Sequence, residues 1–338
     1  MDRGRTRITV AGAGALGLVI AWGLARAGFR VSVFDPAQAN ASSVAAGMLA
    51  PVFETVLDAD VEGHFPLLMA ARDLWPALAG QVGIDLDRRG ALAVGDFEFL
   101  TRMTLGISQL GLATERLARS DLDAAVPGLG PAFQEGLLTQ EDWRLEPVPA
   151  MSALRKAAMA AGVDFHLGPF TGLGEGDKLV IATGAGRDLI PIAPLLRVLT
   201  PIKGQILRGR GQGFDGVLRL PGGYCVGGSG ALAVGATMEP GLSDLTPTPE
   251  ARSRLEALAW QAFPGRAADF QTQVGVRAAT PDGLPMIGCT ADPNVFLAVG
   301  ARRNGWLLAP MAAQIITACL TEGEAGPYAA RLDPMRFV

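Results

Sequence analysis

The amino-acid sequence of 338 residues predicts an α/β fold made of two interleaved lobes. The N-terminal stretch from Ile8 to Asp35 has the order strand, tight turn, helix, strand. Two later apolar runs, 178–181 and 295–299, lead into small residues, as buried parallel strands often do. Short strand-like runs separated by glycine turns indicate a second, α+β lobe built on an antiparallel sheet.

The N-terminal stretch carries a glycine fingerprint. Ile8 to Val10 favour a strand, and Gly12, Gly14 and Gly17 follow with G-x-G-x-x-G spacing before an Ala/Leu-rich helical stretch. The first glycine makes the turn, the second lets the backbone approach a pyrophosphate, and the third lets the helix pack closely on its strand. The free N–H groups of the helix N-terminus then face the phosphates. The stretch therefore predicts a Rossmann-like βαβ unit that binds a dinucleotide.

An acidic residue stands where this fingerprint expects one. Asp35 ends the second strand, about 20 residues after the glycines, and can accept a hydrogen bond from a ribose hydroxyl. Its negative charge would repel a 2′-phosphate. FAD or NAD therefore fits the fingerprint, and NADP fits it poorly.

The same stretch allows a weaker interpretation as a secretion signal. Arg3, Arg5 and Arg7 precede an uncharged run from Ile8 to Ala25, and Ala25-Arg26-Ala27 resembles a signal-peptidase site. The three fingerprint glycines and the strand that follows favour the dinucleotide-binding interpretation.

Composition and charge argue against several other classes of protein. Hydrophobic residues make up 49% of the chain and charged residues 18%, which is typical of a compact enzyme rather than a disordered chain. The net charge of −4 comes without a basic block, so we expect no nucleic-acid partner. The uncharged stretch after Asn304 is short for a membrane span, so we expect a buried helix there and no membrane span.

The cysteines and histidines are few. Cys225, Cys289 and Cys319 are odd in number and far apart, which fits neither a disulfide framework nor a zinc site and indicates a reducing cytoplasm. His64 and His166 are the only histidines, so a metal cluster or a Ser-His-Asp triad has little to draw on. We therefore expect a cytoplasmic protein without a metal site, and a homo-oligomer is compatible with its sequence.

The first half of the chain leaves the βαβ lobe and returns to it. Residues 65–78 have helical apolar spacing that Pro76 bends or restarts. From Ile84 the pattern changes to short strands at 91–94 and 133–138, with a charged helical piece at 98–119 between them. A helix at 150–161 and a strand at 163–166 then belong to the βαβ lobe again.

The second half repeats this alternation. The strand at 178–181 runs into small residues, and antiparallel strands at 204–208, 224–226 and 231–237 then resume the second lobe. An amphipathic helix at 250–262 and a strand at 273–277 follow, and the chain ends with the strand at 295–300 and an apolar helix. The strand ends at Gly12, Thr183 and Gly300 should meet at one edge of the sheet, where ligands of α/β folds bind.

Longer motifs span essentially the whole chain. They are GAGALG at 12–17, AAGMLAP at 45–51, PIKGQ at 201–205, VGATMEPG at 234–241, VGVRAATPDGLPMIG at 274–288 and GARRNGWLLAP at 300–310. With these motifs the chain resembles the FAD-dependent D-amino-acid oxidase superfamily, and most closely the glycine oxidases of thiamine biosynthesis. The resemblance implies the D-amino-acid oxidase and glutathione-reductase type of fold. It also implies an FAD-binding domain (1–83, 145–195 and 275–338) and a substrate-binding domain (84–144 and 196–274).

The resemblance implies a role for four side chains at the substrate. Arg277 matches the arginine that grips the substrate carboxylate, a role that suits a planar guanidinium donating two hydrogen bonds. Tyr224 matches the substrate-site tyrosine, Met238 a methionine that lines the same small pocket, and Arg303 the arginine of the family's GHxRNG segment. From the residues alone, Arg277 in an apolar strand already calls for a ligand or a buried acid nearby. Tyr224, Met238 and Arg303 alone could equally be packing or surface residues.

The resemblance also implies a set of cofactor contacts. The helix that begins near Asn304 would stabilise negative charge on the reduced flavin. The expected FAD-binding residues are Gly12, Ala13, Gly14, Ala15, Leu16, Gly17, Asp35, Ala45, Ala46, Gly47, Met48, Leu49, Phe170, Thr183, Gly184, Arg277, Arg303, Asn304, Gly305, Trp306 and Leu307.

The sequence departs from the family pattern at the rim of the substrate pocket. The histidine of GHxRNG is Ala301, an extra Arg302 follows it, and the histidine two residues before the substrate tyrosine is Gly222. These changes leave the preferred amino acid open. Related sarcosine oxidases attach their flavin through a cysteine just upstream of the turn that matches Thr280, and no cysteine stands there, so we expect noncovalent FAD.

The resemblance implies oxidation of an amino acid by the flavin, with the protein orienting the substrate. The expected reaction takes glycine or a small D- or N-methyl amino acid to the oxo acid and ammonia. It proceeds by hydride transfer to flavin N5, and molecular oxygen then yields hydrogen peroxide, in the service of thiazole formation for thiamine. The alternative is a D-amino-acid dehydrogenase of the same fold that passes electrons to another acceptor. A third hypothesis, an NAD-binding or non-catalytic sensor, uses only the first βαβ unit.

Overall fold

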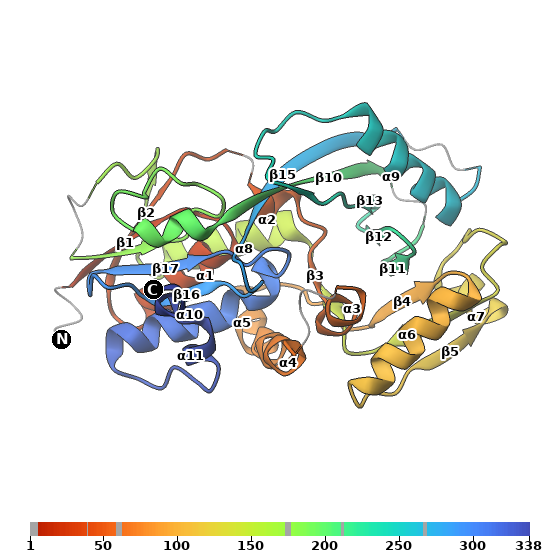
Figure 1. Ribbon diagram of the computed structural model, residues 1–338, viewed down its shortest axis with the longest axis horizontal. Coiled ribbons are helices and arrows are strands. Elements are labelled where there is room, and N and C mark those ends of the chain that lie inside the picture. The colour runs from red at the N-terminus through yellow and green to blue at the C-terminus, as the bar shows by residue number, and fades with distance from the viewer. Residues whose placement is uncertain (1–5, 39, 59–62, 173–176, 211–212, 266–268) are drawn as a thin grey trace.

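The computed structural model describes residues 6–38, 40–58, 63–172, 177–210, 213–265 and 269–338. Arg3 and Arg5, which belong to the alternative secretion signal, lie outside these residues. The described chain forms two lobes, each around its own sheet, with α3 (Pro51–Leu57) between them (Figure 1). The predicted α/β fold with a parallel and an antiparallel sheet is confirmed.

The βαβ lobe is built on a six-stranded sheet. Its strand order is β16 (Met286–Cys289), β17 (Val295–Val299), β9 (Lys178–Ile181), β1 (Arg7–Ala11), β2 (Arg30–Asp35) and β8 (Asp164–Leu167). Every neighbouring pair is parallel except β16 with β17, which is antiparallel. The sequence predicted each of these strands except β16. Because β17, β9 and β1 are adjacent, their carboxyl ends open at one edge of the sheet.

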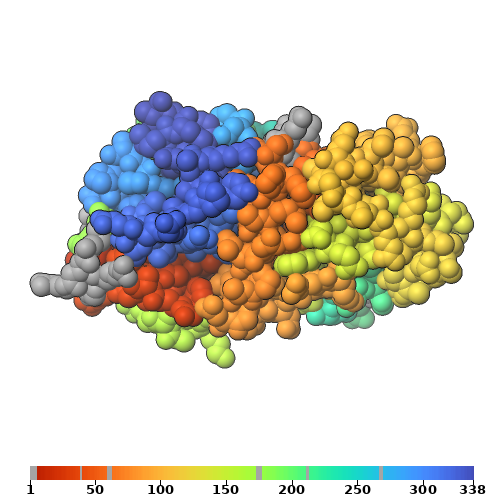
Figure 2. Space-filling view, turned by 90° about the horizontal axis from the view of Figure 1, so that it is seen from below, coloured from red at the N-terminus to blue at the C-terminus, as the bar shows by residue number. Residues whose placement is uncertain are grey.

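Helices rich in small residues cover this sheet. Among them, α1 (Ala15–Arg26) packs on α10 (Gly305–Thr321), and Gly23 faces Ala313 at their contact. The helices α4 (Phe65–Asp73), α5 (Trp75–Val82), α8 (Pro147–Ala160) and α11 (Ala329–Leu332) complete the layer, and short 3₁₀ helices cover 194–198 and 334–337. As predicted, Pro76 restarts the helix, because a proline is tolerated in a first helical turn. Figure 2 shows the orange segment that includes α4 and α5 between the blue C-terminal part and the yellow segment.

A small two-stranded sheet joins the lobes. After α2 (Ala41–Val44), the strand β3 (Met48–Leu49) pairs with β7 (Trp143–Arg144), and α3 then begins at Pro51. The buried Asp142 next to β7 accepts hydrogen bonds from the Val52 and Phe53 amides, at 2.7 and 3.0 Å. These bonds satisfy two of the free N–H groups at the N-terminus of α3.

The α+β lobe contains a larger sheet. Its order is β14 (Glu239–Pro240), β10 (Thr200–Arg210), β13 (Ala231–Gly235), β12 (Gly223–Gly228), β11 (Gly216–Leu220), β4 (Ala91–Val94), β6 (Glu135–Thr139) and β5 (Glu115–Ala118), with β15 (Gln271–Ala279) paired to β10. The helix α9 (Pro249–Ala262) packs on one face, and α6 (Phe97–Gln109) and α3 pack on the other. The two longest strands, β10 and β15, reach from this sheet toward the βαβ lobe (Figure 1).

The structure corrects one element of this lobe. Residues 98–119 do not form a single helical piece, because α6 ends at Gln109 and Gly111 adopts a positive φ of 75°. The edge strand β5 follows and pairs with β6, and α7 (Arg119–Ala125) comes after it. The strands β11 and β5 were not predicted, because an edge strand of four residues and a strand of five residues leave little periodicity in the sequence.

The uncharged stretch after Asn304 forms α10, most of whose residues are buried, as the sequence predicted. Among the described residues, no helix combines the length and the apolar character that a bilayer crossing requires.

An ionic cluster of Asp87, Arg89, Arg144 and Asp215 makes a testable contribution to stability. Asp87 accepts hydrogen bonds from Arg89 at 2.8 Å and from Arg144 at 2.9 Å. Although burial opposes ionisation of this carboxyl, the two arginines lower the pKa of Asp87 to about 2. A lowered pKa stabilises the fold above the unfolded pKa of 3.8, and the stabilisation is lost as the pH falls toward 2.

We therefore expect Asp87→Asn to lower the free energy of unfolding at neutral pH by about 1–2 kcal/mol. The difference from the wild-type protein should shrink as the pH is lowered from about 5 to about 3. Urea unfolding at several pH values measures it. A difference that stays constant over this range would contradict the assignment.

Candidate functional site

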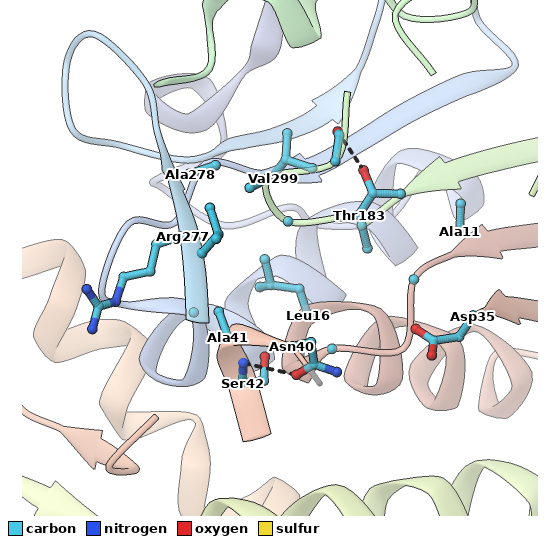
Figure 3. A pocket seen from close by; sticks show the side chains of 18 of the residues that line it. Ala11, Leu16, Asp35, Asn40, Ala41, Ser42, Thr183, Arg277, Ala278 and Val299 are labelled. Atoms are coloured by element: carbon cyan, nitrogen blue, oxygen red, sulfur yellow. Dashed lines mark hydrogen bonds between the residues drawn. The ribbon is translucent and has the colours of Figure 1, made fainter. Parts of the chain in front are cut away.

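A cavity of about 470 Å³ opens at the carboxyl ends of β1, β9 and β17, within the size range of cofactor sites. Gly12, Thr183 and Gly300, the three strand ends singled out in the sequence, all line it. Asp35 lies at one end and Arg277 at the other (Figure 3). Leu16 and Ala41 line one side between them. The cavity is therefore elongated and joins the fingerprint to the arginine on β15.

The fingerprint glycines are required by close backbone approaches. Gly12 has a φ of 105°, and a Cβ on it would lie 2.5 Å from the Ala182 carbonyl oxygen. A Cβ on Gly17 would lie 2.0 Å from the carbonyl oxygen of Gly12, so any side chain there would push α1 off the turn. Both glycines thus hold the turn that lines the cavity.

Asp35 is anchored to the same turn. Its Oδ2 accepts a hydrogen bond from the Ala13 amide, and its Oδ1 accepts one from the Ala37 amide, each at 2.7 Å. A carboxylate has about four acceptor positions, so Asp35 keeps capacity for a hydroxyl in the cavity. At this end of the cavity, Phe170 packs edge-on against the Phe34 ring, which stacks on His166.

Ser42 is a cavity residue that the sequence analysis missed. Its hydroxyl accepts a hydrogen bond from the Ala15 amide at the start of α1, at 3.0 Å. Its carbonyl accepts one from the Trp306 indole, also at 3.0 Å. Asn40 caps the short helix α2 by accepting from the Ser42 and Ser43 amides, drawn in part in Figure 3. The capping pattern N-x-x-S was the signal that could have identified this segment.

Arg277 marks the other end of the cavity. Its guanidinium points away from Asp35 (Figure 3), donates to the Thr237 carbonyl at 3.3 Å and lies 3.2 Å from the Met238 sulfur. Among the described residues, no carboxylate forms an ion pair with it. Burial lowers the pKa of Arg277 below its usual range, which reflects the cost of holding this cation away from water. A half-buried guanidinium of this kind is suited to bind an anionic ligand.

Arg277 is seated on a glycine of the neighbouring strand. Ile202 of β10 pairs with Arg277 of β15, and a Cβ on Gly204 would lie 2.3 Å from the Arg277 Nη1. The glycine of the PIKGQ motif therefore makes room for the guanidinium.

This contact gives a prediction. Gly204→Ala should displace the guanidinium and raise the substrate KM by roughly 10-fold, since a methyl group in a filled site costs about 1–3 kcal/mol. Gly80→Ala, where a Cβ meets open space, is the control and should leave KM unchanged. Steady-state kinetics measure both variants, and an unchanged KM in Gly204→Ala would show that the guanidinium is not held there.

Tyr224 and Met238 lie near Arg277. Tyr224 lies on β12 directly opposite Gly235 of β13, and a Cβ on Gly235 would lie 2.6 Å from the phenol oxygen. The described residues give the Tyr224 hydroxyl no hydrogen-bond partner. Burial raises the pKa of Tyr224 above its usual range, so the phenol is a hydrogen-bond donor at neutral pH.

A cluster of charges lies beside this group. Arg303 forms ion pairs with Glu54 at 2.8 Å and with Asp58 at 2.6 Å. Arg219 of β11 donates to Glu54 at 3.0 Å, and Arg302 pairs with Asp58. The sequence analysis singled out Arg303 but missed Glu54, Asp58 and Arg219. For Glu54 and Arg219 the available signal was a charged residue inside an apolar run, in PVFETVL at 51–57 and in VLRL at 217–220.

The predicted cofactor residues divide into two groups in the structure. Those that line the cavity are Gly12, Gly14, Ala15, Leu16, Asp35, Phe170, Thr183, Gly184, Arg277 and Gly305. Those that are not among its lining residues are Ala13, Gly17, Ala45, Ala46, Gly47, Met48, Leu49, Arg303, Asn304, Trp306 and Leu307. Gly47 belongs to the second group. A Cβ on it would lie 2.0 Å from the Leu145 carbonyl oxygen, so this glycine allows a close approach of protein backbone.

Two of the three residues that depart from the family pattern line the cavity. Ala301 is buried and lines the cavity, and Arg302 lines it with a positive φ of 48°. Gly222 is exposed, and a Cβ on it would meet nothing within 4 Å. The departures therefore place Arg302 in the lining of the cavity, whereas Gly222 is not among its lining residues.

Together these features fit a bound dinucleotide. The turn at Gly12 allows a close backbone approach, the N-terminus of α1 offers amides for phosphates, and Asp35 keeps acceptor capacity for a ribose. Cavity-lining residues connect this end continuously to Arg277 and to Gly305 at the N-terminus of α10, where a positive helix end favours negative charge.

Comparisons with known proteins agree with this geometry. The FAD dependent oxidoreductase family, DAO, matches residues 7–319. A glycine oxidase of Pseudomonas aeruginosa is 29% identical over 96% of this chain and 98% of its own length. A protein of Rhizobium etli named as a thiamine biosynthesis oxidoreductase, ThiO, is 33% identical over 94% of this chain and 97% of its own.

Solved structures agree as well. The crystal structure of glycine oxidase from Geobacillus kaustophilus superimposes with a TM-score of 0.85 at 25% identity, and the match covers 98% of this chain and 100% of that one. The chain therefore belongs to the DAO family of FAD-dependent oxidoreductases and is an FAD-dependent amino-acid oxidoreductase.

Proposed function

We propose that the protein oxidises glycine or a small D- or N-methyl amino acid to the oxo acid. The nitrogen leaves as ammonia from a primary amine and as methylamine from an N-methyl amine, molecular oxygen is the electron acceptor, and hydrogen peroxide is formed from it. The observation that carries the proposal is Arg277, a half-buried guanidinium at the end of the cofactor cavity without a carboxylate partner among the described residues. A substrate carboxylate would supply the missing negative charge through two parallel hydrogen bonds.

The remaining residues around Arg277 suit a small substrate. Tyr224 has a free phenol donor for the same carboxylate, and Met238 fills the space next to the guanidinium with apolar surface. Fixing the carboxylate at one point orients the Cα–H bond of the substrate, and orientation is the main catalytic contribution we assign to the protein.

FAD would lie along the cavity, held by the fingerprint turn, Asp35, Ser42 and the N-terminus of α10. When bound, it supplies the two-electron oxidation of the Cα–N bond of the substrate. We propose that it is bound noncovalently, because none of the three cysteines lines the cavity. We also propose that the chain divides into an FAD-binding domain and a substrate-binding domain with the bounds given above. The strand β15 then crosses the boundary between the two domains at residue 275.

We also propose a place and a pathway for the reaction. The three cysteines are free thiols, which supports a cytoplasmic location. The likeness to the Rhizobium etli protein supports a role in thiamine biosynthesis, with glycine oxidation providing material for thiazole formation.

Oxygen consumption tests the proposal. Purified enzyme with glycine, sarcosine or D-alanine should consume oxygen and release equal amounts of peroxide and oxo acid, and catalase should return half of the oxygen. An enzyme that consumes no oxygen with these substrates but reduces an artificial acceptor would instead be the dehydrogenase that the sequence left as the alternative.

A further inference from the structure

Glu54 is a buried carboxylate that lies between two arginines next to the proposed substrate site. Its side chain is 8% exposed, and it forms an ion pair of 3.0 Å with Arg219 and one of 2.8 Å with Arg303. Breaking a buried pair of this kind by removing one partner is costly, because the other charge stays buried and uncompensated. Glu54 therefore holds the guanidinium of Arg219 and shares that of Arg303 with Asp58, which lies 2.6 Å from it.

Arg219 connects Glu54 to the substrate site through an aromatic contact. Its guanidinium lies 5.6 Å from the centroid of the Tyr224 ring and 5.8 Å from that of Phe53. Arg219 and Tyr224 are also direct neighbours across β11 and β12. Because a cation placed against an aromatic ring is attracted to it, the position of Arg219 affects that of the Tyr224 ring.

Glu54 also balances charge around Arg277. Arg303 and Arg302 lower the pKa of Arg277, and the charge of Glu54 raises it. Glu54 is placed on α3, whose N-terminus is fixed by the buried Asp142. A rigid helix thus presents the carboxylate to arginines from β11 and from the turn before α10.

We propose that Glu54 is a positioning residue of the substrate site, which fixes Arg219 and Arg303 around the substrate so that its carboxylate binds Arg277 in a single orientation. The inference rests on the proposed function and adds a residue that does not itself touch the substrate. Without the Glu54 charge, the cluster becomes more positive and should still attract an anion. The anion would then bind in more than one orientation, and catalysis would suffer while binding does not.

Glu54→Gln tests this separation of binding from catalysis. Acetate serves as an unreactive carboxylate, and its Kd is measured by the change in the flavin absorption spectrum. In the variant, acetate should bind as tightly as in the wild-type enzyme or more tightly. The kcat for the amino acid that reduces the wild-type enzyme fastest should fall roughly 10- to 100-fold, the cost of a small misplacement of a bound substrate.

Three further variants make the result decisive. Glu135→Gln removes an exposed carboxylate paired with Arg116 at 3.1 Å and should change neither quantity. Glu54→Asp keeps the charge but is too short to reach both arginines, so its kcat should lie between those of the wild-type enzyme and Glu54→Gln. If Glu54→Gln does not fold, the double variant Glu54→Gln/Arg219→Met restores the charge balance and should show the same low kcat with retained acetate binding.

Either of two results would overturn the proposal. One is a wild-type kcat in Glu54→Gln or in the double variant, and the other is a loss of acetate binding in parallel with kcat, which a merely structural role predicts. Failure of the proposed function is a separate result, because it is seen in the wild-type enzyme as a flavin that no amino acid reduces.

Discussion

The Gly17→Ala variant is expected to purify with little FAD. A Cβ at this position would lie 2.0 Å from the carbonyl oxygen of Gly12, a backbone atom that cannot move aside alone. The helix α1 or the turn must therefore shift, and both line the end of the cavity that we assign to the phosphates. Overpacking of this kind costs about 1–3 kcal/mol, so the FAD Kd should rise roughly 10- to 100-fold.

Gly23→Ala is the matched control because it makes the same change in the same helix. Its Cβ would lie 3.7 Å from Ala313 and Thr317, an ordinary contact, so the variant should keep its FAD. The ratio of flavin to protein absorbance and a titration of the apoprotein with FAD measure both variants. Normal FAD binding in Gly17→Ala would mean that the cofactor does not depend on the fingerprint turn.

The Arg277→Met variant is expected to keep its FAD and to lose most of its activity. Methionine fills a similar volume but cannot donate to a carboxylate, and truncating one partner of a buried charged hydrogen bond costs about 2–5 kcal/mol. The kcat/KM should therefore fall roughly 30- to 5,000-fold. Arg277→Lys restores the charge without the planar fork and should recover only part of the loss.

The control for this experiment is Arg116→Met, which removes an arginine of an exposed ion pair. It should behave as the wild-type enzyme in steady-state kinetics, since exposed pairs contribute little. A wild-type kcat/KM in Arg277→Met would show that Arg277 does not bind the substrate carboxylate. A loss of FAD in this variant would mean that Arg277 serves the cofactor instead.

The sequence predicted best what is encoded locally. The unit from β1 to β2 follows from a glycine spacing, two β-favouring runs and one acidic residue, all within about 30 residues. The buried strands β9 and β17 were found because continuous apolar runs ending in small residues are typical of a parallel sheet. The helix break at Pro76 follows from the chemistry of proline itself.

What the sequence did not predict depends on distant partners. The strand β5 is largely exposed and pairs only along the edge of β6, so its pattern carried little signal and was taken as part of a helix. Glu54 and Arg219 meet across 165 residues, and nothing in either local stretch names the other. Ser42 contacts α1 and α10 only because the fold brings α2 next to the N-termini of both helices.

The candidate site shows the same division. Arg277 could be singled out from its own strand, because a lone charge in an apolar run calls for a partner. That Gly204 makes room for it, or that Gly235 makes room for Tyr224, requires the strand register of the α+β sheet. Tyr224, Met238 and Arg303 were selected by resemblance to a family, and their roles remain predictions.

The most direct test of the account is the visible spectrum of the purified protein during anaerobic titration with glycine, sarcosine and D-alanine. The account predicts flavin bands in the protein as isolated and their bleaching by at least one of these amino acids, with acetate causing only a shift of the bands. Flavin bands that stay oxidised with every amino acid would contradict the assignment of Arg277 and its neighbours as an amino-acid site.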